Sequence, residues 1–177
     1  QNSSFAYQII PQVGISKVDS VLTDQSIKIV RNDTVIQAVT NTKSQLIQAV
    51  FYRSATLRLP NGLEITPNHP CALMLEFIDG NAILTLANPR CESLNPNYIQ
   101  VTVNEIWKGQ DVEVYGKSSK ITLPLPQGDF SGSKVQNTYL REDCNGVIGG
   151  SASFDNCNVC SGGNTGIQPN INCTGYC

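Results

Sequence analysis

The residue types that could do chemistry gather near the end of the chain, where five of the seven cysteines follow position 140. Beside them stand Asp143, Asn145, Asp155 and Asn156, whose side-chain oxygens suit calcium. The same residue types also form tight turns without a metal, so both interpretations stay open. Zinc on closely spaced cysteines is disfavoured, because thiolate clusters of that kind belong mainly to reducing compartments and no histidine lies in this segment.

The cysteine count predicts disulfides. We expect them from Cys144, Cys157, Cys160 and Cys173, which leaves Cys177 as the odd cysteine of the tail. Seven cysteines and three Asn-x-Ser/Thr sequons in 177 residues indicate an oxidising, extracellular compartment. The chain begins without Met, and we expect it to be a processed or excised piece of a longer protein.

A further pair of cysteines flanks a predicted hairpin. Cys71 begins an apolar run, Cys91 follows the next run, and Asn81 lies midway between them. A turn centred on Asn81 would place the two cysteines opposite each other on antiparallel strands, within disulfide distance. The sequence therefore predicts a Cys71–Cys91 bridge, with two unpaired buried thiols as the alternative.

No acid–base constellation stands out in the sequence. The single histidine, His69, lies between prolines before a predicted strand, where a surface turn residue is expected rather than a general base. Aromatic rings offer flat apolar faces on which a sugar could stack, and Trp107, Tyr98 and Tyr115 are the candidates. Core or rim positions for the same three residues are the alternative. We predict no catalytic residue.

The elements that must position these residues are strands. From about residue 26 to residue 125, apolar residues alternate with polar ones, and Asn61-Gly62 and Asp79-Gly80 supply tight-turn signals between the runs. This pattern predicts an all-β fold, an antiparallel β-sandwich. The alternating apolar residues are Ile27 and Ile29; Ala55, Leu57 and Leu59; Ile99, Val101 and Val103; Val112 and Val114; and Ile121, Leu123 and Leu125.

Two segments could also be helical. Residues 16–23 have apolar neighbours at helical spacing and predict a short helix at the edge of the sheet. Residues 45–52 fit either pattern, and their β-branched and aromatic content favours a strand. A net charge of −2 and 15% charged residues give no basic face for nucleic acid or an anionic membrane, and no apolar run is long enough to span a bilayer.

Composition changes after residue 140, where large apolar residues become too sparse for an ordinary core. Cross-links must hold this short, disulfide-rich tail together. We therefore expect three parts: residues 1–12 as the end of a preceding domain, residues 13–140 as the sandwich, and residues 141–177 as a cysteine-rich, possible calcium-binding segment.

Several motifs of moderate specificity resemble the C-terminal β-sandwich domain of polysaccharide lyase family 8, which includes hyaluronate, chondroitin and xanthan lyases. Residues 5–11 resemble a strand that closes the family's central sandwich, and residues 32–39 resemble the Asn-led turn and Gln-Ala-Val strand that begin the C-terminal domain. The other matching segments are residues 70–75, residues 82–89, and residues 121–124 with Gly128 and Gly132.

The tail resembles the Asp-Cys-x-Gly and Asp-x-Cys-x-x-Cys-x-Gly-Gly repeats of secreted Bacteroidetes proteins, which are similar to thrombospondin type 3 calcium repeats. That resemblance implies a spacer before a binding or sorting domain. It is carried by Asp143, Cys144, Gly146, Gly149, Gly150, Asp155, Cys157, Cys160, Gly162 and Gly163.

The lyase resemblance implies a parent enzyme that degrades uronic-acid-containing polysaccharides by β-elimination. The family's catalytic residues come mainly from an N-terminal α/α toroid and partly from the central sandwich, and none of those motifs is present in this sequence. The chain is therefore expected to be a secreted, non-catalytic accessory domain whose partners are the catalytic and central domains of its own parent, and polysaccharide. An independent carbohydrate-binding module and a structural cell-surface spacer are the alternatives.

Overall fold

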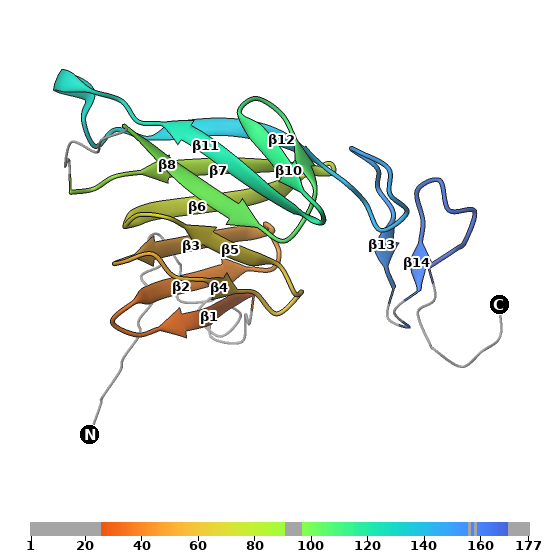
Figure 1. Ribbon diagram of the computed structural model, residues 1–177. Helices are drawn as coiled ribbons and strands as arrows, with labels where there is room; N and C mark the ends of the chain where they lie inside the picture. Colours follow the sequence, from red (N-terminus) through yellow and green to blue (C-terminus); the bar gives the residue numbers. More distant parts are fainter. Residues whose placement is uncertain (1–25, 91–96, 156, 158, 170–177) are drawn as a thin grey trace, which may run out of the picture.

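The computed structural model describes residues 26–90, 97–155, 157 and 159–169. Two antiparallel sheets pack face to face over most of this range, as the alternating sequence predicts (Figure 1). One sheet has seven strands in the order β1-β2-β3-β6-β7-β12-β9, and the other has five in the order β10-β11-β8-β5-β4. The part of the chain that the structure describes contains no helix long and apolar enough to cross a membrane.

The strands are short, as expected for a sandwich. Those of the seven-stranded sheet are β1 (Ile27–Asn32), β2 (Ile36–Asn41), β3 (Leu46–Phe51), β6 (Cys71–Ile78), β7 (Asn81–Ala87), β9 (Trp107–Lys108) and β12 (Val135–Arg141). Those of the five-stranded sheet are β4 (Leu57–Arg58), β5 (Glu64–Pro67), β8 (Tyr98–Val103), β10 (Val112–Tyr115) and β11 (Ser118–Pro124). A 3-10 turn, η2 (Gly128–Phe130), precedes β12, and the tail carries β13 (Ser153–Phe154) and β14 (Cys160–Ser161).

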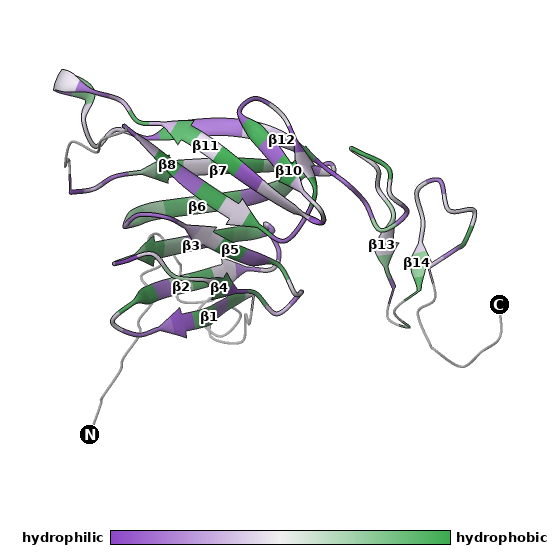
Figure 2. Cartoon of the chain, in the orientation of Figure 1, coloured by the Kyte–Doolittle hydropathy of each residue, from purple (hydrophilic) through white to green (hydrophobic). Residues whose placement is uncertain are grey.

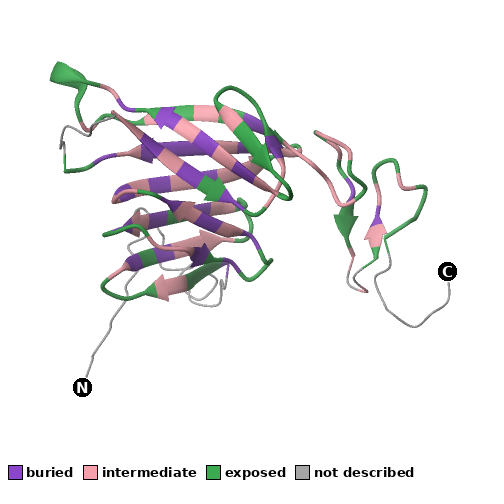
Figure 3. Cartoon of the chain, viewed as in Figure 1, coloured by how far each residue is buried: buried purple, intermediate pink, exposed green. Residues whose placement is uncertain are grey.

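The core lies between the two sheets and is made by every second residue of the strands. Phe51, Leu75 and Leu84 face inward from the seven-stranded sheet, while Ile99 and Ile121 face them from the other, and all five are buried. Figure 3 shows the resulting alternation of buried and more exposed residues along the strands. Burial of each such side chain contributes roughly 1.5–3 kcal/mol, so this core is the main source of the sandwich's stability.

The two ambiguous segments have different outcomes. Residues 45–52 contain β3, which confirms the predicted strand. Residues 16–23, for which we predict a helix, lie outside the described residues. Three of the alternating residues are exposed, and all three lie on edge strands: Ile27 and Ile29 on β1, and Val114 on β10.

The hairpin of β6 and β7 corrects the predicted Cys71–Cys91 bridge. Its turn is centred on Asp79-Gly80 rather than on Asn81, because both residues take the positive φ of a tight turn and Ile78 pairs with Asn81. In the resulting register Ala72 pairs with Ala87, so the position opposite Cys71 is residue 88. Cys71 is a free thiol, and burial raises its pKa to about 12, which makes it unreactive. Cys91 lies outside the described residues.

Candidate functional site

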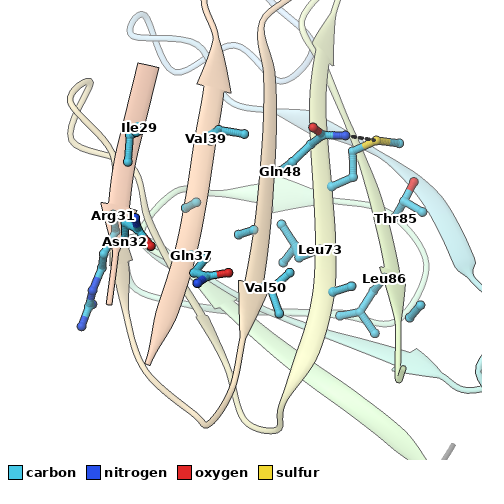
Figure 4. Close-up of a pocket in the computed structure, with 15 residues that line it drawn as sticks. Ile29, Arg31, Asn32, Gln37, Val39, Gln48, Val50, Leu73, Thr85 and Leu86 are labelled. Carbon is cyan, nitrogen blue, oxygen red and sulfur yellow. Dashed lines mark hydrogen bonds between the residues drawn. The ribbon is translucent and has the colours of Figure 1, made fainter. Parts of the chain in front are cut away.

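The most distinctive surface is the outer face of the seven-stranded sheet, the face turned away from the core. A shallow groove of about 570 Å³ crosses β1, β2, β3, β6 and β7 there. Figure 4 shows side chains from these five neighbouring strands lining it. The groove is therefore a product of strand pairing, which sets residues distant in sequence side by side.

Two cross-strand rows make up this face. The first runs from Ile29 through Val39, Gln48 and Met74 to Thr85, each residue paired with the next. The Gln48 amide donates to the Met74 sulfur at 3.9 Å. The second row consists of Gln37, Val50, Ala72 and Ala87, paired in the same way. Apolar residues and neutral amides thus occupy positions that a solvated sheet face ordinarily fills with charges.

The charge on this face is correspondingly low. Arg31 is the single ionisable residue among the described residues that line the groove. Its guanidinium is engaged, with Nε 2.6 Å from a carboxylate oxygen of Asp33 and Nη1 donating to the Thr56 carbonyl. Backbone amides of Ile36 and Val35 and the Arg31 side chain lower the pKa of Asp33 to about 2. The groove therefore offers no acid–base pair and suits an apolar, uncharged surface.

The sequence carries a signal for this face that the period-two argument passes over. The β6 sequence Cys71–Ile78 is apolar at almost every position instead of every second one, and β3 and β7 contain similar stretches. Strands covered on both faces have near-continuous apolar sequences. The outer face was thus readable in the composition of its strands, while the residues that meet across it depend on the register.

Trp107 is not part of a sugar-stacking surface. Its side chain is fully buried, its ring stacks on Tyr139 at 6.0 Å, and its indole nitrogen donates to a carboxylate oxygen of Glu105 at 3.0 Å. The stacking prediction is wrong for this residue and the core alternative is confirmed. A lone tryptophan in a sequence carries no sign of the partner that buries it, since Tyr139 comes from β12, far along the chain.

Tyr98 and Tyr115 do not lie together either. Tyr98 is level with Pro124 at one end of β11, and β10 places Tyr115 opposite Ser118 at the other end. Six residues of strand separate these ends, which corresponds to about 20 Å. The Tyr115 hydroxyl donates to Glu113, and the Lys120 ammonium lies 5.3 Å from its ring centre. The three aromatics proposed for sugar stacking are therefore separate.

The tail aspartates accept hydrogen bonds from backbone amides. Asp143 Oδ1 accepts from Asn145 and Val147, and Oδ2 accepts from Ala152. These bonds, led by that from Val147, lower the Asp143 pKa. Asp155 Oδ1 similarly accepts hydrogen bonds from the backbone amides of Cys157 and Val159.

This is the geometry of tight turns, the metal-free interpretation of the sequence. Within the described residues, no group of three or more His, Cys, Asp or Glu side chains is placed to hold a metal ion. Asn145 is exposed and Asn156 lies outside the described residues. A calcium site in the tail stays a prediction.

Disulfides hold the tail, as its cysteine content predicts. Cys144 and Cys160 are bonded, with their Cα atoms 5.7 Å apart. Cys157 is also disulfide-bonded. Cys173 and Cys177 lie outside the described residues.

Comparison with known proteins shows which domains the chain is similar to. Residues 28–93 match the family model described as polysaccharide lyase family 8, C-terminal beta-sandwich domain. The chain is also 26% identical to chondroitinase-AC of Pedobacter heparinus over 138 residues, which is 77% of this chain and 18% of that protein. The sandwich is therefore similar to part of chondroitinase-AC, and the chain spans less than a fifth of that relative's length.

Solved structures have the same fold. A chondroitinase AC lyase superposes with a TM-score of 0.56 at 22% identity, covering 68% of this chain and 17% of that one. Paenibacillus xanthan lyase superposes with a TM-score of 0.57 at 19% identity, covering 73% and 12%. A chondroitin AC lyase of Streptomyces coelicolor A3 gives 0.56 at 12% identity, covering 72% and 17%. In each case the sandwich corresponds to a small part of a much longer chain.

Proposed function

We propose that this chain is a non-catalytic accessory domain of an extracellular polysaccharide lyase, and that the outer face of its seven-stranded sheet docks onto the rest of the same protein. The homology to chondroitinase-AC supports the class of parent, since the matched region is a minor fraction of that relative. Breakage of uronic-acid-containing polysaccharide by β-elimination would then belong to the parent's other domains.

The observation that carries this proposal is the apolar outer face. Two paired rows expose Ile29, Val39, Val50 and Met74 where a sheet facing water would carry charges. Contiguous apolar surface on a soluble domain marks an interaction site. The occupant is another domain of the parent chain, because the matched relative extends far beyond the region that this chain covers, and β1, the first described strand, lines the groove.

Direct binding of an acidic polysaccharide fits this face less well. A polyanion is held by exposed arginine and lysine side chains, which pair with carboxylate and sulfate groups. The one cationic side chain among the described groove residues, Arg31, already pairs with Asp33. A neutral face of this kind matches the apolar surface of a neighbouring protein domain.

The test is a charge placed on the docking face of the full-length parent. Val50→Lys puts an ammonium in the groove, where burial against a neighbouring domain would cost about 3 kcal/mol. The matched control is Thr102→Lys, at an exposed position of β8 on the outer face of the other sheet. We expect the groove variant to lower the parent's thermal midpoint and its release of unsaturated product, and the control to leave both unchanged.

Two results would contradict the proposal. One is an equal response of the groove variant and the control. The other is turnover by the isolated chain, seen as ultraviolet absorbance of unsaturated product from hyaluronan, chondroitin or xanthan. Glycan binding by the isolated chain without turnover would favour an independent carbohydrate-binding module instead.

A further inference from the structure

The first loop of the tail, residues 142–150, is hydrogen-bonded into the end of the sandwich. The Glu142 amide donates to the Ile106 carbonyl at 3.0 Å, and the Gly149 amide donates back to the Arg141 carbonyl at 2.6 Å. Glu142 and Ile148 form an antiparallel bridge. The loop therefore continues the strand pairing of β12 instead of leaving the sheet as free chain.

The turn between β6 and β7 packs against the same loop. A methyl group at Gly80 would lie 3.1 Å from the Gly150 carbonyl oxygen, so the two backbones pack closely against each other. The Arg141 amide also donates to the Gly80 carbonyl. The loop thus touches the sandwich at two places, the β6–β7 turn and the segment before β9.

The Arg141 side chain is held in place at the end of β12, immediately before the loop. Its Nε and Nη2 each lie 2.9 Å from a different oxygen of the Glu105 carboxylate, and its guanidinium carbon lies 4.3 Å from the centre of the Phe77 ring. Glu105 also accepts from the indole nitrogen of the buried Trp107. A two-point ion pair stacked on an aromatic ring restricts both partners more than a single exposed contact does.

The Asp143 carboxylate accepts three hydrogen bonds from backbone amides of its own loop and of Ala152, which fixes the loop's shape. Gly150 packs directly against this carboxylate. The described residues of the second loop, 155, 157 and 159–163, repeat the arrangement. The Asp155 amide donates to the Val159 carbonyl as the Asp143 amide donates to Val147, both at 2.9 Å. Cys144 of the first loop is bonded to Cys160 of the second. Two similar loops, each with an aspartate that accepts hydrogen bonds from its backbone amides, are therefore joined by a disulfide.

We propose that the tail is a rigid strut rather than a flexible linker. Residues 142–150 fold as part of the sandwich, and the Cys144–Cys160 disulfide fixes the second loop to them. Chain that follows the second loop would then leave the sandwich in a set direction. The boundary of the sandwich unit falls after residue 150 instead of near residue 140. This proposal is independent of the docking face and of the lyase function.

Hydrogen–deuterium exchange of the whole chain tests the strut. In the unmodified protein, the backbone amides of Asn145, Val147, Gly149 and Ala152 should exchange as slowly as the backbone amides of β12. Gly150→Ala would force a methyl group onto the Asp143 carboxylate at a position without positive φ. We expect it to speed exchange of these loop amides about tenfold, the factor that corresponds to one lost hydrogen bond. The matched control, Ser151→Ala at an exposed neighbour, should change nothing.

A second variant separates the two joints. Replacing Cys144 and Cys160 together with serine removes the disulfide without leaving a free thiol. The amides of Cys157 and Val159 should then exchange faster, while those of the first loop keep their protection. Fast exchange of the first-loop amides in the unmodified chain would overturn the proposal. Loss of first-loop protection in the serine variant would also overturn it, because the disulfide and not the sandwich would then hold that loop.

Discussion

The sandwich and the tail are held together by different physics, although they share one chain. In the sandwich, two sheets bury a continuous apolar core. In the tail, the buried side chains are few, and hydrogen bonds to Asp143 and Asp155 and the Cys144–Cys160 disulfide fix the backbone. Figure 2 shows apolar residues recurring along the strands of both sheets, with only short apolar segments after β12. The two regions should therefore respond to different perturbations.

The largest effect is expected from opening the sandwich core. Trp107 is fully buried and stacks on Tyr139, so Trp107→Ala leaves a large cavity. We expect the free energy of unfolding to fall by about 3–5 kcal/mol, measured by urea denaturation. Gly109 packs against the Tyr139 ring, since a methyl group there would lie 2.7 Å from a ring carbon. A loss below 1 kcal/mol would mean that the sandwich does not depend on this core.

The next effect should be confined to the tail. The Cys144–Cys160 disulfide closes a loop with a sequence separation of 16, for which the chain-entropy model gives about 3 kcal/mol. Mild reduction should make residues after 150 sensitive to protease and leave the unfolding midpoint of the sandwich unchanged. The buried Cys71 thiol provides an internal control, because it should stay unreactive toward an alkylating reagent until the sandwich itself unfolds. A large fall in the sandwich midpoint on reduction would erase the distinction between the two regions.

The contrast also explains which features the sequence could predict. Alternating apolar residues report a half-buried strand through its own side chains, so Ile99, Val101 and Val103 could be assigned to β8 without any tertiary information. The partner of Cys71 could not be assigned in this way. It depends on whether the hairpin turns at Asp79-Gly80 or at Asn81, and that small shift moves the facing position from residue 91 to residue 88.

The candidate site was harder to predict than the fold. Ile29, Val39, Gln48, Met74 and Thr85 form one row only because four strand registers align them. The same holds at the junction, where Glu105 and Arg141 are 36 positions apart in the chain. Non-local pairs of this kind leave no periodic trace in the sequence. The tail disulfide was predictable as a class, because cysteine content shows that cross-links exist, but its connectivity was not.

A smaller, pH-dependent effect should again separate the regions. Hydrogen bonds from backbone amides of the tail, led by that of Val147, lower the pKa of Asp143 from its ordinary value of 3.8. The Asp143 carboxylate therefore stabilises the first loop above pH 3.8, and this stabilisation is lost as the pH falls through the lowered pKa. We expect amide chemical shifts of Asn145, Val147 and Ala152 to titrate in acid below pH 3.8, with core amides of the sandwich unchanged. Asp143→Asn removes the titrating group and should abolish the step. A persistent step in that variant would assign it to another carboxylate.

The smallest effect is expected from the exposed polar cluster on β10 and β11. Lys120 lies 3.1 Å from a Glu113 carboxylate oxygen, and both side chains are partly or largely exposed. The Tyr115 hydroxyl and then Lys120 lower the Glu113 pKa, and Glu113 raises the pKa of Lys120, but water and salt screen such surface pairs. Lys120→Ala should therefore change the thermal midpoint by no more than the scatter of repeated measurements. Arg141→Ala provides the contrast, because its bidentate pair with Glu105 is about three-quarters shielded from solvent and lies at the end of β12, where the strut begins. If the two substitutions changed the thermal midpoint equally, the partly buried position of the Arg141–Glu105 pair would add nothing to its contribution to stability.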